Sequence, residues 1–248
     1  MVVSPGDVKG RHTGQVSDEG GGQRAVRRGV GRPRLGTDHI TETALRILDE
    51  QGAEALSMRS LAQRLNSSTA TLYRHFPNRA ALVDAVIDRV IGEVDVDGEE
   101  IRTGTWRQAC RTIATDYFAA LSRHHGVALL LADHTPTGPN GAMVRERWLE
   151  AMLRDGFPLD LAVRSGALIS SYVQGFGIQL GGQRVARGLD AELIPAAAKM
   201  LDQAGFPATA QALTAGVLPV PLEDEFVLGL DLILDGLSTL RDDPNTGL

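Results

Sequence analysis

Apolar residues recur at every third or fourth position along most of the chain between residues 37 and 241. This spacing places them on one face of an α-helix, and no stretch of useful length alternates apolar with polar residues as a strand would. The pattern predicts helices at about 37–51, 58–65, 69–76, 78–94, 105–124, 127–134, 140–155, 159–183 and 223–241. The sequence therefore predicts an all-α fold.

Two regions interrupt this periodicity. Residues 95–104 are polar and are predicted to form a loop. The region 184–222 is mixed: residues 191–204 are predicted to be helical, but the prolines beyond them are predicted to break the rest of the region. These prolines are Pro207, Pro219 and Pro221.

The segment 57–79 contains the most specific local signals. Ser57 is a good N-cap for a first short helix, and the apolar pair Leu56 and Leu61 has the spacing of a hydrophobic staple. Asn66 tolerates the left-handed backbone conformation that ends a helix. The first short helix is therefore predicted to end in a tight turn.

A second short helix comes after the turn. Ser68 is its predicted cap, and Leu72 and Phe76 are its inward-facing residues. Asn78 is placed to cap the next helix. Two short helices joined by such a turn form a helix-turn-helix arrangement.

The charge of this segment differs from that of the whole chain. Residues 57–79 carry four arginines and no acidic side chain, although the formal net charge of the protein is −6. A basic patch on an acidic protein is the electrostatic footprint of phosphate binding. The outward residues of the second helix are small, or long and polar, and so suit a DNA major groove. The plainer interpretation is a pair of amphipathic helices on a solvated surface.

Three motifs favour the DNA-binding interpretation. LAQRL (61–65), T-LY-HF (71–76) and the Asn-Arg-x-x-Leu start of the next helix (78–82) resemble the DNA-binding segment of the TetR family of bacterial repressors. The sequence departs from the family at Asn66, where glycine is common. The helix face and the resemblance together give the expected DNA-contacting residues: Arg59, Thr69, Ala70, Thr71, Tyr73, Arg74, His75 and Arg79. His75 has packing against the next helix as an alternative role.

The resemblance implies a division of the chain. Residues 37–83 are expected to form the three-helix DNA-binding domain, and residues 84–248 a larger helical domain for ligand binding and dimerisation. Residues 1–36 contain few bulky apolar side chains and are predicted to be a disordered basic arm. Its end, RRGVGRPR (27–34), suits a DNA minor groove, or else it is a solvated tail that only adds positive charge.

The segment from about Gly126 to Leu180 resembles the ligand-binding domain of the tetracycline repressors, with Asp-Gly-Phe-x-Leu (155–159) as a landmark. Those repressors bind a magnesium chelate. In this sequence the position of one of their histidine ligands falls on Leu130 or Leu131, and Gln179 stands where they have a glutamate linked to the magnesium. We therefore predict no metal and no cofactor, and instead an apolar cavity with a few polar groups. The candidate ligand contacts are Tyr117, Leu130, His134, Trp148, Tyr172, Gln174, Phe176 and Gln179. For each of these residues the alternative to ligand contact is packing in the hydrophobic core.

The predicted helices 159–183 and 223–241 have broad apolar faces interrupted by small residues. They suit a four-helix bundle formed with a second copy of the chain, or they fill the core of one subunit. The resemblance implies the homodimer. The small residues are Ala167, Ser170, Ser171, Gly175, Gly177, Gly229 and Gly236.

The composition and the motif search argue against several other classes of protein. The only cysteine, Cys110, leaves no internal disulfide, and no apolar stretch is long enough to span a membrane. No signal-peptide pattern, nucleophile–base spacing or phosphate loop is present, so we expect a cytoplasmic protein that is not an enzyme.

The expected function is a repressor released from palindromic double-stranded DNA by a small molecule. The alternative is a DNA-binding regulator controlled by a protein partner, or an activator.

Overall fold

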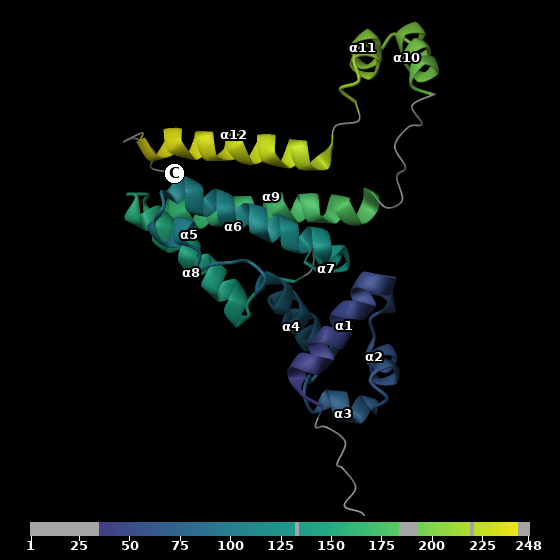
Figure 1. Ribbon diagram of the computed structural model, residues 1–248, viewed down its shortest axis with the longest axis vertical. Helices are drawn as coiled ribbons and strands as arrows, with labels where there is room; N and C mark the ends of the chain where they lie inside the picture. The colour runs from purple at the N-terminus through teal and green to yellow at the C-terminus, as the bar shows by residue number, and fades with distance from the viewer. Residues whose placement is uncertain (1–34, 132–133, 184–192, 219–220, 243–248) are drawn as a thin grey trace, which may run out of the picture. The chain divides into compact units, whose positions relative to one another are not determined.

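The computed structural model describes residues 35–131, 134–183, 193–218 and 221–242 (Figure 1). The predicted basic arm lies outside the described residues, except for Leu35 and Gly36. The described part is entirely helical and contains no strand, which confirms the predicted all-α fold. Its helices are α1 Thr37–Gln51, α2 Met58–Arg64, α3 Thr69–Tyr73, α4 Arg79–Ile91, α5 Glu99–Thr103, α6 Trp106–Arg123, α7 His125–Leu130, α8 Pro139–Arg154, α9 Leu159–Gln183, α10 Ile194–Gln203, α11 Pro207–Thr214 and α12 Leu222–Asp242, with a 3-10 turn at Ala53–Ala55.

Helix α9 is the central element of the C-terminal part, because it packs against α6, α7, α8 and α12. Its contact with α12 is aromatic. The ring of Phe226 on α12 stacks on that of Tyr172 on α9 with centroids 5.5 Å apart, and on that of Phe118 on α6 with centroids 4.1 Å apart. Tyr172 on α9 donates its hydroxyl hydrogen to the Phe226 carbonyl at 2.8 Å. Figure 1 shows α9 and α12 running side by side.

The Asp-Gly-Phe turn has a structural role. The Asp155 carboxylate accepts the backbone N–H of Trp106 at 2.8 Å and so caps the start of α6. Gly156 has φ +88°, a conformation that favours glycine. The turn after α8 therefore also fixes the beginning of α6.

Close contacts join the first helix to the C-terminal part. Gly126 in α7 lies directly on the backbone of α1, because an added Cβ would be 2.6 Å from the Leu48 carbonyl oxygen. The His124 ring nitrogens contact Asp49 of α1 at 2.9 Å and Glu93, just after α4, at 3.2 Å. Burial raises the pKa of Glu93, but Arg123 and His124 outweigh it and hold that pKa below its ordinary value. One apolar core runs from α1 to α12.

Several predicted boundaries were wrong. Helix α3 ends at Tyr73 rather than Phe76, because the chain turns there and Phe76 enters the core from beyond the helix. Helix α4 ends at Ile91 rather than near residue 94. Helix α7 covers His125–Leu130 instead of 127–134.

Two helices were missed in regions without clear periodicity. The predicted loop 95–104 contains α5, whose single buried apolar residue, Ile101, is too little to produce a periodic pattern. Pro207 opens α11 instead of ending helical structure, because proline is well suited to the first turn of a helix. Helices α10 and α11 share a small core of their own, made by Ala198, Ala210 and Leu213.

Within the described ranges, no helix has both the length and the apolar character needed to cross a bilayer.

Candidate functional site

The turn between α2 and α3 is fixed by local hydrogen bonds. Asn66 has φ 48°, as predicted. The Asn66 N–H donates to Gln63 O at 3.0 Å, and the Ser67 N–H donates to Ala62 O at 2.9 Å. This pair of bonds is a Schellman motif, which satisfies the last carbonyls of α2 and reverses the chain.

The predicted caps are confirmed on all three helices. Ser57 and Ser60 form a reciprocal capping box at α2. The Ser68 side chain accepts from the Thr71 N–H at 3.2 Å, and the Asn78 side chain accepts from the Ala81 N–H at 2.8 Å. Each helix therefore starts at a residue that the sequence specifies.

Helices α2 and α3 are held together by a small apolar core. Leu56, Leu61 and Leu72 are buried, and so is the small Ala62. On the opposite side of α3 the side chain of Tyr73 is 51% exposed, an unusual position for a large aromatic residue. Thr69, Ala70 and Arg74 are exposed as well, whereas Thr71 and His75 are half-buried.

The four arginines of residues 57–79 have different surroundings. Arg64 forms an ion pair with Glu50 of α1. The Arg79 Nε donates to the Leu56 carbonyl at 3.1 Å and so braces the start of α4 against the start of α2. Arg59 and Arg74 are exposed and form no ion pair with any described residue. The free positive charge of this surface therefore lies mainly at these two positions.

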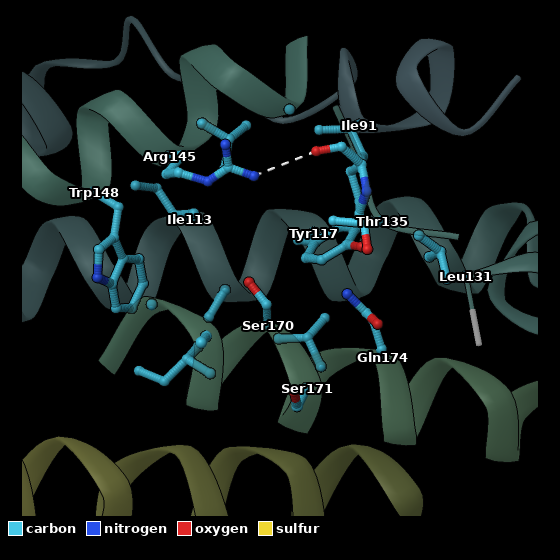
Figure 2. Close-up of a pocket in the computed structure, with 18 of the residues that line it drawn as sticks. Ile91, Ile113, Tyr117, Leu131, Thr135, Arg145, Trp148, Ser170, Ser171 and Gln174 are labelled. Atoms are coloured by element: carbon cyan, nitrogen blue, oxygen red, sulfur yellow. Dashed lines mark hydrogen bonds between the residues drawn. The ribbon is translucent and has the colours of Figure 1, made fainter. Parts of the chain in front are cut away.

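A cavity of about 530 Å³ lies between α4, α6, α8, α9 and the segment that joins α7 to α8 (Figure 2). Its walls are mainly apolar, with contributions from Ile91, Ile113, Leu131 and Leu149. The polar residues that line it are Tyr117, His134, Thr135, Arg145, Ser170, Ser171 and Gln174.

Two buried donors in the cavity wall lack partners. Tyr117 Oη and Trp148 Nε1 have no hydrogen-bond partner of normal geometry within the described residues. Burial raises the pKa of Tyr117 to about 12, and the Gln174 side chain beside it acts in the opposite direction. An added Cβ on Gly166 would lie 3.2 Å from Trp148 Nε1, so glycine makes room for the indole. Buried polar groups are normally paired, so these two donors are available to a molecule that enters the cavity.

Comparison with known proteins agrees with this geometry. The family model "Bacterial regulatory proteins, tetR family" matches residues 40–86. The family model "Tetracyclin repressor-like, C-terminal domain" matches residues 100–241, more than half of the chain. The protein belongs to the TetR family.

Several TetR relatives are similar over long stretches. The repressor DrrR1 of Streptomyces coeruleorubidus is 32% identical, over 84% of this chain and 79% of its own. ActR of Streptomyces coelicolor in complex with actinorhodin is 31% identical with a TM-score of 0.73, over 84% of this chain and 99% of its own. The class E tetracycline repressor of Escherichia coli is 29% identical, over 57% of this chain and 67% of its own. The TetR family consists of DNA-binding transcriptional regulators rather than enzymes.

The cavity gathers half of the ligand contacts that the sequence predicted. Tyr117, His134, Trp148 and Gln174 line the cavity, and Figure 2 shows Tyr117, Trp148 and Gln174 there. The other four do not line it. Leu130 is buried, with Leu131 at the cavity instead, and Tyr172 and Phe176 join the aromatic contact with α12. Gln179 lies exposed, more than a turn beyond Gln174 on α9.

Polar residues that were not predicted as ligand contacts also line the cavity, among them Arg145, Ser170 and Ser171. Arg145 lies three residues before Trp148, so a helix face drawn through Trp148 would have included it. The two serines were considered only as small residues for helix packing. Their position in the cavity wall depends on how α9 is rotated against α6 and α8.

Proposed function

We propose that this TetR-family protein is a homodimeric repressor that leaves a palindromic operator when a polycyclic aromatic, oxygen-rich molecule occupies the cavity. The observation that carries the proposal is the pair of unpartnered buried donors, Tyr117 Oη and Trp148 Nε1, in a cavity that also touches α4. A volume of about 530 Å³ is in the range of small-molecule sites.

The ligand class is supported by shape, chemistry and relatives. The apolar walls and the Trp148 indole favour a flat aromatic body, and the free donors favour acceptor oxygens on it. ActR, which is similar to this chain over nearly its whole length, has been solved with actinorhodin and with (S)-DNPA. We infer that the effector of this protein belongs to the same broad class of compounds.

The DNA-binding surface is proposed to be α3 and the start of α2. Tyr73, Arg59 and Arg74 are exposed there, and the two arginines are free to reach phosphates or base edges. We keep the proposed division into a DNA-binding domain at 37–83 and a ligand-binding domain at 84–248. Arg79 is proposed to act mainly by holding the start of α4, through its bond to Leu56 O.

The proposed dimer uses α9 and α12. Leu228 and Leu232 lie one turn apart on α12, and each is 63% exposed. On α9, Leu168 is also exposed. Gly175 and Gly236 have open space where a Cβ would be, so a second copy can approach closely at these positions. Large exposed apolar residues on two adjacent helices are typical of an interface.

The proposed route from cavity to DNA runs through α4. This helix begins at the helix-turn-helix and ends at Ile91, which lines the cavity. Its Asp84 contacts the cavity residue His134 at 2.8 Å. A ligand that moves His134 or Ile91 therefore acts on the helix that positions α3.

A second contact joins α4 to α8. The N-cap of α8 is Gly138, which has no capping side chain, and the buried Asp88 of α4 takes that role. Asp88 Oδ1 accepts the Gly141 N–H at 3.0 Å, and Oδ2 accepts from Asn140 Nδ2 at 3.1 Å. Since Trp148 in α8 lines the cavity, a shift of α8 is transmitted to α4 through this cap. Two recognition helices that must fit half-sites about 34–36 Å apart would then lose their spacing.

The test is binding to DNA from upstream of the protein's own gene. Arg59→Ala and Tyr73→Ala are each expected to weaken specific binding by about tenfold or more, the usual cost of a lost base or phosphate contact. Arg147→Ala is the control, because it removes an equal charge from α8, far along the chain from the DNA-binding segment. Actinorhodin serves as the probe and is expected to release the wild-type protein.

Other results would redirect the proposal. Unchanged DNA binding in both Arg59→Ala and Tyr73→Ala would show that α3 is not the recognition helix. Specific DNA binding that no cavity ligand alters, with no ligand-dependent change in melting temperature, would favour control by a protein partner.

A further inference from the structure

One charged side chain in the cavity wall, the exposed Arg145, lacks a counter-charge among the residues that the structure describes. Arg145 extends from α8 along the cavity, and its Nη2 donates to the Pro136 carbonyl at 3.3 Å (Figure 2). It forms no ion pair with a described residue. The other ionisable base of the cavity wall, His134, is already in contact with Asp84.

The guanidinium ends of the other two arginines of α8 have partners. Arg147 contacts Glu150 at 2.9 Å and Asp97 at 3.3 Å. Arg154 donates to two backbone carbonyls, those of Arg102 and Gly104. Arg145 differs because, among the described residues that line the cavity, none carries a carboxylate.

The chemistry of the cavity is therefore that of an anion site beside an aromatic one. A guanidinium presents a planar set of donors that matches a carboxylate in two parallel hydrogen bonds. The neutral donors Tyr117 Oη and Trp148 Nε1 suit the uncharged oxygens of the same molecule. The cavity thus contains separate partners for an acid group and for a ring system.

We propose that the effector is an aromatic acid and that Arg145 selects it by binding its carboxylate. This inference rests on the proposed effector site and specifies the class of molecule that the site takes. The carboxylate lies at Arg145, near the segment 134–141, and the rings lie against Ile113, Trp148 and Leu149. Neutral compounds with the same rings fit the apolar part but leave the guanidinium without its anion.

The test uses two matched probes with the purified full-length protein and no DNA. Rhein is a dihydroxyanthraquinone with one carboxylate, and aloe-emodin has the same rings with a neutral hydroxymethyl group in its place. Affinities are measured by isothermal titration calorimetry. Wild type is expected to bind rhein at least about tenfold more tightly than aloe-emodin, because a hydrogen-bonded ion pair exceeds a neutral contact.

Arg145→Gln is expected to remove this preference by weakening the binding of rhein but not that of aloe-emodin. Arg145→Lys is expected to keep part of the preference. Arg147→Gln, two residues away on the same helix and outside the cavity wall, is expected to keep the wild-type preference. Preserved binding of aloe-emodin to Arg145→Gln shows that the variant is folded and that its cavity is intact. The preference in wild type should also shrink as salt concentration rises.

The proposal is overturned if wild type binds the two probes equally, if it fails to bind rhein, or if Arg145→Gln keeps the preference. Equal weakening of both probes in Arg145→Gln also overturns it, because that result assigns Arg145 a structural role. Release from the operator is measured separately with either probe. Binding of aloe-emodin without selectivity for rhein leaves the proposed effector site standing, whereas selective binding of rhein without operator release removes the proposed regulation.

Discussion

At the scale of single residues, the cavity has an energetic cost for the empty protein. The Tyr117 hydroxyl and the Trp148 indole N–H are buried and have no partner of normal geometry among the described residues, and a buried unpaired polar group costs about 1–3 kcal/mol. If these two side chains served only the core, apolar side chains of similar shape could replace them without loss of stability. In the proposed complex a ligand that supplies acceptors recovers this cost, so the proposal links the stability of the protein to ligand binding.

Tyr117→Phe is expected to stabilise the empty protein by about 1 kcal/mol, because it removes a buried hydroxyl that has no partner. The same variant is expected to show a smaller rise in melting temperature when actinorhodin is added. Differential scanning calorimetry with and without the ligand measures both effects.

Tyr172→Phe is the matched control for this prediction. Its hydroxyl donates to the Phe226 carbonyl, so its removal should destabilise the protein by about 1 kcal/mol. A loss of stability in both tyrosine variants would contradict the assignment of Tyr117 as an unpaired donor.

At the scale of elements, α4 is joined to α8 by a polar contact in addition to the apolar face that it buries in the core. Asp88 caps α8 from outside, and two glycines make the space for this contact. A Cβ on Gly138 would lie 2.3 Å from the Asp88 carboxylate, and a Cβ on Gly92 would lie 2.7 Å from Asn140 Nδ2. The junction of α4 and α8 is therefore shaped for one arrangement.

Asp88→Ala is expected to destabilise the protein by about 1–3 kcal/mol, because it leaves the buried N–H of Gly141 without its acceptor. It should retain ligand binding but show a smaller ligand-induced loss of operator affinity, measured by fluorescence anisotropy of labelled DNA. Asp97→Ala is the control, since its contact with Arg147 is largely exposed. If the ligand released Asp88→Ala from the operator as fully as it releases the wild type, α4 would be coupled to the cavity by another route.

At the scale of the whole molecule, the small residues of α9 and α12 have two kinds of surroundings. Gly177 and Gly229 are packed within the subunit, where an added Cβ would lie 2.8 Å from Leu121 and 2.2 Å from Tyr172. Gly175 and Gly236 face open space. The core interpretation thus applies to the first pair of glycines, and the face with the second pair is the one that we propose as the interface.

Leu232→Glu is expected to yield a monomer and to abolish high-affinity operator binding, because the proposed interface would have to bury an unpaired charge. Sedimentation velocity measures the oligomeric state at several concentrations. Leu153→Glu, a similar change at an exposed leucine of α8, should leave the association state unchanged. A dimer of wild-type affinity in Leu232→Glu would move the interface away from this face of α12.

The sequence by itself determined the all-α fold, the family and the helix-turn-helix with its caps at Ser57, Ser68 and Asn78. These features depend on interactions between residues a few positions apart, or on short motifs. The tertiary structure decided what depends on residues far apart in the chain. Examples are the position of Arg145 in the cavity wall and the cap that Asp88 supplies to α8, because each depends on how separate helices are rotated against one another. The same reason explains why Tyr172 and Phe176 were selected for the cavity but pack against α12.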